Sequence, residues 1–190
     1  MTISPDFDSF QARYESGKPQ LVWTKLVADL ETPVSAYLKL CRNRAGATFL
    51  LESVEGGAAR GRYSMIGLDP DVIFRVAGDK ADINRDALNN PDAFTPCDSA
   101  PLIALRQLIA ESAVAQSAQL PPMAAGVFGY LGYDMVRQME RLAPAKADPI
   151  GVPDALLIRP TVMVVFDTVR DEISIVTPVR PRAGVPAKAA

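Results

Sequence analysis

The sequence predicts an α+β domain built on antiparallel β-sheets with flanking α-helices. Three observations support this class. Segments of strand character outnumber helical ones. Several of these strands follow one another with no helix between them, which is typical of antiparallel sheets. The two segments with helical spacing each carry a proline near their start, as many helices do. At 190 residues the chain is long enough for one domain with its own core.

The first strand is expected at 21–28, "LVWTKLVA", where β-branched and aromatic residues are concentrated. Thr32 followed by Pro33 then predicts an N-cap and the first residue of a helix. The apolar residues of that helix recur at helical spacing, so they should share one face. They are Val34, Tyr37, Leu38 and Cys41.

Three further strands are expected at 47–53, 62–67 and 71–78, the last of them bounded by turn residues. The short segment "ADIN", 81–84, should pair with the strand before it. From 85 to 100 the chain is polar and contains prolines, which predicts a surface loop.

The second helix is expected over "PLIALRQLIAES", 101–112, with Asp98 or Ser99 as its cap. A glycine-bearing strand followed by a short helix is expected within 123–142. The apolar residues of this short helix, predicted to lie on one side, are Met135, Met139 and Leu142.

Two strands at 156–167 and 172–178, joined by a turn at 168–170, predict a β-hairpin. The tail after this hairpin has no apolar periodicity, and we expect the chain to be part of a longer protein.

Composition excludes several classes of function. Hydrophobic residues make up 48% of the chain and the net charge is −2, so a globular protein without general affinity for nucleic acid or membrane surfaces is expected. The sequence lacks the apolar run of a signal peptide or membrane span, which predicts a cytoplasmic protein. Cys41 and Cys97 match no metal-ligand spacing. The absence of histidine removes the commonest general base.

Several residues that could belong to a binding or catalytic site are better explained by a structural role. Gly126, Gly129 and Gly132 do not match a nucleotide-binding spacing, and we interpret them as strand glycines that allow close packing. Three further interpretations concern side chains. Tyr130 and Tyr133 are expected in the core, Asp134 and Arg137 on a solvated helix face, and Asp69 and Asp71 at a surface turn.

Glu52 and Ser53 are the exception, because they directly follow the apolar segment "FLL". A carboxylate there is expected to be half-buried, and a buried carboxylate needs a cation. Arg62 could supply it in a structural salt bridge. Alternatively, the ammonium of a ligand could bind Glu52, with polar contacts from Ser53 and apolar walls from Leu50, Leu51 and Met65.

Three segments together resemble a known family. "FLLESVEGG…GRYSMIG", "GVFGYLGYDMVRQMERL" and "PDALLIRPTVMVVFD" are similar, in order and spacing, to the N-terminal region of anthranilate synthase component I. The close relative aminodeoxychorismate synthase component I shares much of this pattern. The resemblance implies that residues 1–190 form a single N-terminal regulatory domain without the C-terminal chorismate-binding catalytic domain.

The resemblance also implies a function. The complete enzyme converts chorismate and ammonia to anthranilate and pyruvate in tryptophan biosynthesis, with a glutamine amidotransferase subunit as partner and Mg²⁺ bound by residues outside this chain. This chain alone is expected to contain no catalytic or metal-binding residues. In the family, L-tryptophan inhibits by feedback at a site that the "LLES" segment helps to line. The tryptophan-binding residues implied here are Leu51, Glu52, Ser53 and Arg62.

Two alternatives of another class remain open at the level of the sequence. The chain could be a free-standing amino-acid-binding module, or an interaction domain in which the Glu52–Arg62 pair is purely structural.

Overall fold

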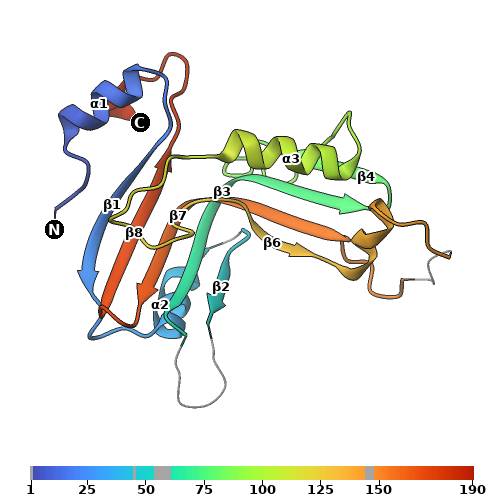
Figure 1. Cartoon of the computed structure of the whole chain (residues 1–190), viewed down its shortest axis with the longest axis horizontal. Helices are drawn as coiled ribbons and strands as arrows, with labels where there is room; N and C mark the ends of the chain where they lie inside the picture. The colour runs from blue at the N-terminus through green and yellow to red at the C-terminus, as the bar shows by residue number, and fades with distance from the viewer. Residues whose placement is uncertain (1, 45, 54–60, 144–147) are drawn as a thin grey trace. The chain divides into compact units, whose positions relative to one another are not determined.

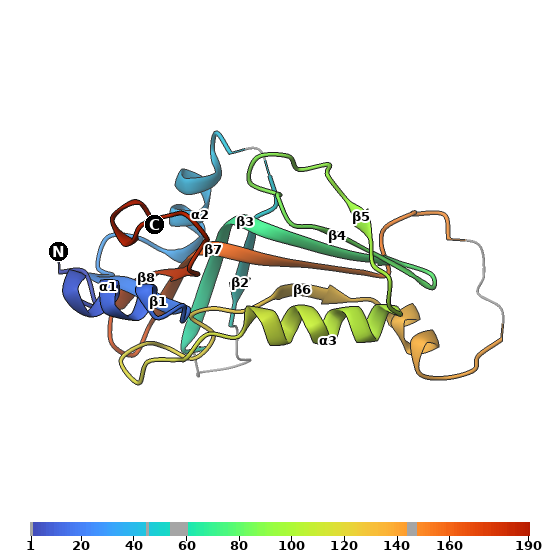
Figure 2. The same ribbon diagram turned by 90° about the horizontal axis from the view of Figure 1, so that it is seen from above.

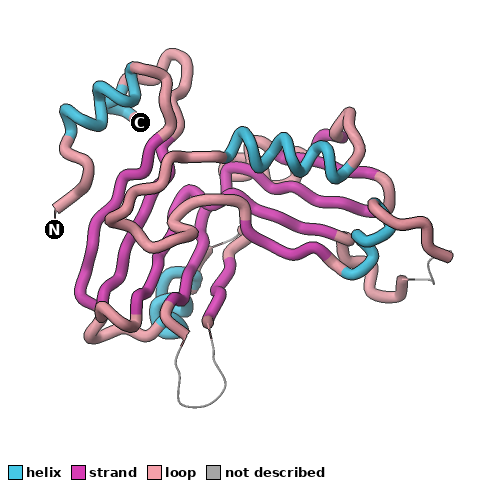
Figure 3. Tube along the Cα trace, in the orientation of Figure 1, coloured by secondary structure: helices cyan, strands magenta, loops and turns pink. Residues whose placement is uncertain are grey.

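The structure, a computed structural model, describes residues 2–44, 46–53, 61–143 and 148–190 (Figure 1). Strands predominate, with a few helices along the chain (Figure 3). The elements are α1 (Phe7–Glu15), β1 (Gln20–Val27), α2 (Pro33–Cys41), β2 (Phe49–Glu52), β3 (Tyr63–Ala77), β4 (Lys80–Asn84), β5 (Thr95–Pro96), α3 (Pro101–Ser112), β6 (Phe128–Leu131), the 3₁₀ helix η1 (Tyr133–Gln138), β7 (Ala155–Asp167), β8 (Glu172–Val179) and the 3₁₀ turn η2 (Ala187–Ala189).

The strands form a sheet in the order β1-β8-β7-β3-β4-β5, with β2 also pairing with β3 and β6 with β7. Neighbours along the chain, such as β3 with β4 and β7 with β8, pair antiparallel. The predicted α+β class with an antiparallel sheet is therefore confirmed. The chain divides into two compact units. Unit 1 comprises Met1–Asp69, Val114–Gly126 and Pro160–Ala190, and unit 2 comprises Pro70–Ala113 and Val127–Arg159.

In unit 1, α2 packs against a buried cluster from β3, β7 and β8. The helix begins as predicted: the Thr32 side chain accepts a hydrogen bond from the Ser35 backbone N–H, and the Ser35 side chain accepts one from the Thr32 N–H. Tyr37 and Cys41 face the cluster, whereas Leu38 is exposed, so only part of the predicted apolar face is buried. The buried members of this cluster are Ile66, Leu68, Val164, Phe166 and Ile173.

The helix α1, also in unit 1, was not predicted. Asp6 caps it by accepting a hydrogen bond from the Ser9 backbone N–H. Phe10 and Tyr14 are buried on one side of the helix, where they form a small cluster with Ala187. Because an isolated helix of nine residues is only marginally stable in water, we expect α1 to depend on this contact.

In unit 2, α3 covers one face of β3 and β4 (Figure 2). It begins at Pro101 after Ala100, and no side chain caps it, so the expectation of an Asp98 or Ser99 cap is wrong. Ser99 instead donates a hydrogen bond to the side chain of Gln107. The buried residues of this unit's core are Val72, Phe74, Val76, Ala81, Ile83, Ala104, Leu105, Leu108, Met135 and Ala155.

The two strands expected at 62–67 and 71–78 are one continuous strand, β3. Asp69 lies at its centre with a positive φ of 50°, and Pro70 follows. The Asp69-Pro70 sequence has the composition of a turn, but β3 continues through it as one strand. Because Pro70 is buried within the strand, turn propensity is overridden here by packing.

The glycines of β6 permit close packing, as predicted. A Cβ atom at Gly129 would lie 2.0 Å from the carbonyl oxygen of Leu156 in β7, and the φ of Gly129 is +154°. Only a residue without a side chain brings β6 this close to β7.

Tyr130 and Tyr133 do not lie in the core, contrary to expectation. They are 42% and 89% exposed. Of the three apolar residues predicted on one side of the short helix that follows, Met135 is buried, whereas Met139 and Leu142 are exposed. The reason is that the 3₁₀ helix ends at Gln138, so Met139 and Leu142 lie beyond it and do not share a helical face with Met135.

The predicted hairpin is confirmed as β7 and β8, joined by a turn in which Asp171 has a positive φ of 49°. None of the helices within the described residues is long and apolar enough to span a membrane.

Candidate functional site

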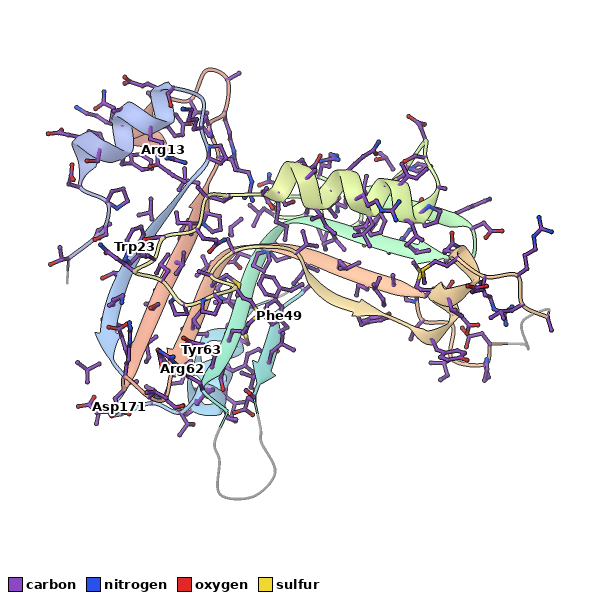
Figure 4. All side chains as sticks on the ribbon, in the orientation of Figure 1. Arg13, Trp23, Phe49, Arg62, Tyr63 and Asp171 are labelled. Carbon is purple, nitrogen blue, oxygen red and sulfur yellow. The ribbon has the colours of Figure 1, made fainter. Side chains whose placement is uncertain are left out.

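The candidate site lies in unit 1, where β2 ends and β3 begins. β2 pairs antiparallel with β3, with Leu51 opposite Met65 and Glu52 opposite Ser64. Met65 and Ser64 are buried in β3. Ser53 follows the last paired residue of β2, and Arg62 and Tyr63 lie where β3 begins (Figure 4).

Glu52 is exposed, so the expectation of a half-buried carboxylate is wrong. β2 has only four residues, and its burial falls from Phe49 and Leu50 toward its end, where Leu51 is already 49% exposed. The carboxylate therefore stays hydrated and needs no cation for its own sake. Among the described residues, Glu52 forms no ion pair.

Arg62 pairs with Asp167 and not with Glu52, so the alternative of a structural Glu52–Arg62 salt bridge is wrong. The Arg62 Nε and Nη2 atoms donate to the two carboxylate oxygens of Asp167 at 3.0 and 2.8 Å. This parallel geometry is the strongest arrangement of arginine and carboxylate. Asp167 is the last residue of β7, which sequence spacing alone does not bring next to residue 62.

The environment of this pair favours both charges. The Asp167 side chain is 4% exposed, while that of Arg62 is 43% exposed. The hydrogen bonds from Arg62 lower the pKa of Asp167, against the opposing effect of burial, and the Val169 backbone N–H adds to the lowering. The same hydrogen bonds raise the pKa of Arg62. The guanidinium also lies 4.8 Å from the ring centre of Tyr63, within range of a cation–π contact.

The backbone at the start of β3 is held by Thr168, the residue after Asp167. The Thr168 N–H donates to the carbonyl of Arg62 at 3.0 Å. The Thr168 hydroxyl lies 3.1 Å from the same carbonyl and 3.2 Å from that of Gly61, and donates to them. Backbone and side chain of residue 62 are thus fixed to the same turn between β7 and β8.

Ser53 lies directly against Gly61. A Cβ atom at Gly61 would lie 2.1 Å from the Ser53 carbonyl oxygen and 2.2 Å from its hydroxyl oxygen. Gly61 is buried, whereas Ser53 is exposed. The two ends of the hairpin therefore meet backbone to backbone at this point, and only glycine fits at position 61.

This arrangement can bind a cation on its solvent side. The exposed Glu52 carboxylate is free to accept hydrogen bonds from an ammonium, and the exposed Ser53 hydroxyl can donate or accept one. Leu51, the residue before Glu52 in β2, also exposes apolar surface. Sequence reasoning missed Asp167 and Thr168, although the turn signal after the predicted strand 156–167 marks where polar side chains leave the sheet.

Two cavities in the described part of the chain lie elsewhere in unit 1. One, of about 560 Å³, is lined by residues of α1 and by residues 181–188, including Tyr14 and Arg182. The other, of about 500 Å³, is lined by Phe7, Phe10 and Val179 among others. Neither is lined by Glu52 or Ser53. Among the described residues, no three acidic, cysteine or histidine side chains gather as metal ligands would.

Comparison with protein-family models finds no match. Curated proteins named anthranilate synthase component 1 do match. The protein from Cereibacter sphaeroides is 49% identical over 184 residues, which is 97% of this chain and 37% of that protein. The protein from Synechocystis is 37% identical over 172 residues, covering 90% of this chain and 33% of that protein. The protein from Thermus thermophilus is 39% identical over 154 residues, which is 81% of this chain and 31% of that protein.

The chain thus spans about a third of the length of the curated relatives it matches. Among solved structures, anthranilate synthase component I from Streptococcus pneumoniae has the same fold, with a TM-score of 0.50 and 23% identity over 83% of this chain and 31% of that one. The chain is therefore related, over nearly its whole length, to the N-terminal region of anthranilate synthase component I.

Proposed function

We propose that this chain is the tryptophan-binding N-terminal part of an anthranilate synthase component I. One observation carries the proposal. In a chain 49% identical to such a protein, Glu52 and Ser53 are both exposed at the end of β2, and Glu52 has no ion-pair partner among the described residues. A carboxylate that the fold leaves unpaired beside a hydroxyl is available to the ammonium of a free amino acid.

The whole protein would convert chorismate and ammonia to anthranilate and pyruvate. A glutamine amidotransferase subunit would supply the ammonia. Magnesium would be held by residues outside these 190, as the resemblance to the family implies. We therefore assign no catalytic step to this chain, and its role in the enzyme would be regulation.

Each proposed contact has a distinct physical role. Glu52 would neutralise the ammonium, Ser53 would form a hydrogen bond, and Leu51 would cover part of the indole. An indole buries about 150–250 Å², worth about 4–6 kcal/mol at roughly 25 cal/mol per Å² before the costs of binding. Arg62 could still contact the ligand, because Asp167 uses only two of the five N–H donors of its guanidinium.

The test is titration calorimetry of L-tryptophan into the purified chain. Glu52→Gln should weaken binding by about tenfold or more, because it removes a charged hydrogen-bond acceptor. Glu140→Gln is the matched control, since Glu140 is also exposed and undergoes the same chemical change. Indole-3-propionate, which lacks the ammonium, should bind the wild type and Glu52→Gln equally.

Loss of tryptophan binding in both variants, or in neither, would contradict the assignment of Glu52. In the full-length protein, Glu52→Gln and a bulky replacement such as Ser53→Phe should keep anthranilate formation and lose its inhibition by tryptophan. Such uncoupling is expected if the inhibitor site is separate from the catalytic site.

The isolated chain should form no anthranilate from chorismate, ammonia and magnesium. The measurement is anthranilate fluorescence, with the full-length protein as the positive control. Turnover clearly above buffer would show that the catalytic residues lie within these 190 residues.

A further inference from the structure

We infer that Arg62, Asp167 and Thr168 form a clamp that positions Ser53 for ligand binding, so that Arg62 acts as a positioning residue. The inference rests on the proposed function, because Ser53 is a ligand contact only if that function is right. The inference goes beyond the proposed function because it assigns a role to Asp167 and Thr168, neither of which is a predicted ligand contact.

The clamp fixes both the side chain and the backbone of Arg62. Two hydrogen bonds from the Arg62 guanidinium reach the carboxylate of Asp167. The backbone N–H of Thr168 donates to the Arg62 carbonyl, and its hydroxyl donates to the same carbonyl and to that of Gly61. Residues 61 and 62 therefore cannot shift along the sheet without breaking several hydrogen bonds at once.

The fixed position of Gly61 in turn restricts where Ser53 can lie. The Ser53 side chain and carbonyl lie so close to Gly61 that even one added carbon atom would overlap them. Ser53 also lies beyond Glu52, the last residue of β2 that pairs with β3. Its position is thus set by contact with the clamped Gly61 rather than by the β-ladder.

The Asp167 carboxylate of the clamp is itself held in place. Asp167 is 4% exposed, and its Oδ1 atom also accepts a hydrogen bond from the Val169 N–H at 3.1 Å. The carboxylate therefore has little freedom to follow a moving arginine. A neutral amide at position 167 would keep the shape but could accept at only one of its two terminal atoms.

A first experiment measures position without any ligand. Hydrogen–deuterium exchange of the peptide that contains residues 49–53 should become about tenfold faster in Asp167→Asn. Asp82→Asn is the matched control, because Asp82 also accepts hydrogen bonds from an arginine, Arg75, in a strand pair of unit 2. Unchanged exchange at 49–53 in Asp167→Asn, or an equal change in the control, would overturn the inference.

A second experiment measures the consequence for binding. Asp167→Asn should weaken tryptophan binding to the chain by about tenfold. Arg62→Lys, which keeps the charge but loses the parallel pair of hydrogen bonds, should have an intermediate effect. In a Ser53→Ala background, Asp167→Asn should cause little further loss, because the clamp acts through Ser53.

Additive losses in that double variant would overturn the inference in favour of a general structural role. The two experiments also separate the inference from the proposed function. If wild type fails to bind tryptophan while exchange at 49–53 still responds to Asp167→Asn, the ligand assignment fails and the positioning of Ser53 stands. If Glu52→Gln abolishes binding and Asp167→Asn changes neither readout, the proposed function stands and the clamp does not.

Discussion

Two parallel arginine–aspartate pairs link β3 to β7, one in each unit, with the charges exchanged between the strands. In unit 1, Arg62, the residue directly before β3, binds Asp167 at the end of β7. In unit 2, Asp71 of β3 binds Arg159 of β7, with both nitrogen-to-oxygen distances at 2.8 Å. Two neighbouring strands thus carry the same interaction in opposite orientation.

The two pairs differ in their surroundings. The guanidinium of Arg62 is 43% exposed, whereas the Arg159 and Asp71 side chains are only 11% and 17% exposed. Arg159 also donates to Ser112 and lies 3.9 Å from Glu111, which binds Arg85. The enclosed network of unit 2 serves the stability of the core, while the more open pair of unit 1 fixes a strand end next to exposed residues. Similar chemistry therefore serves different purposes according to burial.

The largest effect should come from breaking the enclosed pair. Asp71→Ala leaves the Arg159 guanidinium buried without its main carboxylate, so the free energy of unfolding should fall by about 3 kcal/mol. Urea denaturation measures this loss of unfolding free energy. The double variant Asp71→Ala/Arg159→Met should recover part of the loss, because the second substitution removes the buried charge. A loss below about 1 kcal/mol in the single variant would show that Glu111 and Ser112 suffice for Arg159.

A second prediction compares two strand glycines. Gly129→Ala should destabilise the protein by about 2 kcal/mol, because its Cβ would meet the backbone of β7 and its φ suits only glycine. Gly67→Ala in unit 1 should cost less, about 1 kcal/mol, because its Cβ would meet the ring of Phe49, which can move. Thermal unfolding of both variants tests which one loses more stability. A larger loss in Gly67→Ala would contradict the idea that the Phe49 ring moves more easily than the backbone of β7.

A third prediction uses pH to isolate the pair of unit 1. The pKa of Asp167 is lowered in the folded state, so its contribution to stability is full above its unfolded value near 3.8 and is lost as pH falls through the folded value. The stability difference between wild type and Asp167→Asn should therefore be constant above about pH 5 and shrink below about pH 4, by at most about 1.4 kcal/mol per pH unit. Denaturation curves at pH 3 to 7 measure it. A difference that does not change with pH would mean that the carboxylate charge is not what stabilises the pair.

The smallest effect is expected for an exposed pair. Asp134 accepts a hydrogen bond from Arg137 one helical turn away, and the Asp134 carboxylate is 54% exposed, against 4% for that of Asp167. Asp134→Ala should change the free energy of unfolding by less than about 0.5 kcal/mol. Urea denaturation in low and high salt provides the baseline against which the other two pairs are judged. A loss similar to that of Asp71→Ala would remove the distinction based on burial.

The features that local sequence determines could be predicted. The capped helix α2 follows from Thr32 and Pro33, and the β7–β8 hairpin from alternating apolar residues on either side of a polar turn. The exposed Asp134–Arg137 pair follows from helical spacing. In each of these cases, residues close together in the sequence provide the stabilising interactions.

Features that depend on distant partners could not be predicted. Asp71 was expected at a surface turn, but it pairs with Arg159, 88 residues later. Arg62 was one candidate partner for Glu52, ten residues away, whereas the residue that Arg62 binds is 105 residues away. Tyr133 is an aromatic residue of the kind often buried in a core, but it is exposed at the first position of the 3₁₀ helix η1. A single sequence carries no signal for any of these pairings.

The candidate site was predicted in part. The location of Glu52 and Ser53 at the end of a strand is correct, since β2 ends at Glu52. The half-buried state of Glu52 is not, because burial depends on what lies over β2 rather than on the strand itself. Whether tryptophan binds there stays a prediction.

The pairing of β1 with β8 sets a waiting time during protein synthesis. Gln20 pairs with Val179 and Val27 with Glu172, so about 150 residues must be made after β1 before its partner exists. At about 5–20 residues per second, the segment "LVWTKLV" leaves the ribosome roughly 7 to 30 s before it can be paired. Throughout that interval it is an apolar, β-prone segment with no ladder partner in β8. The nascent chain at this stage is therefore a natural substrate for chaperones that bind exposed apolar segments.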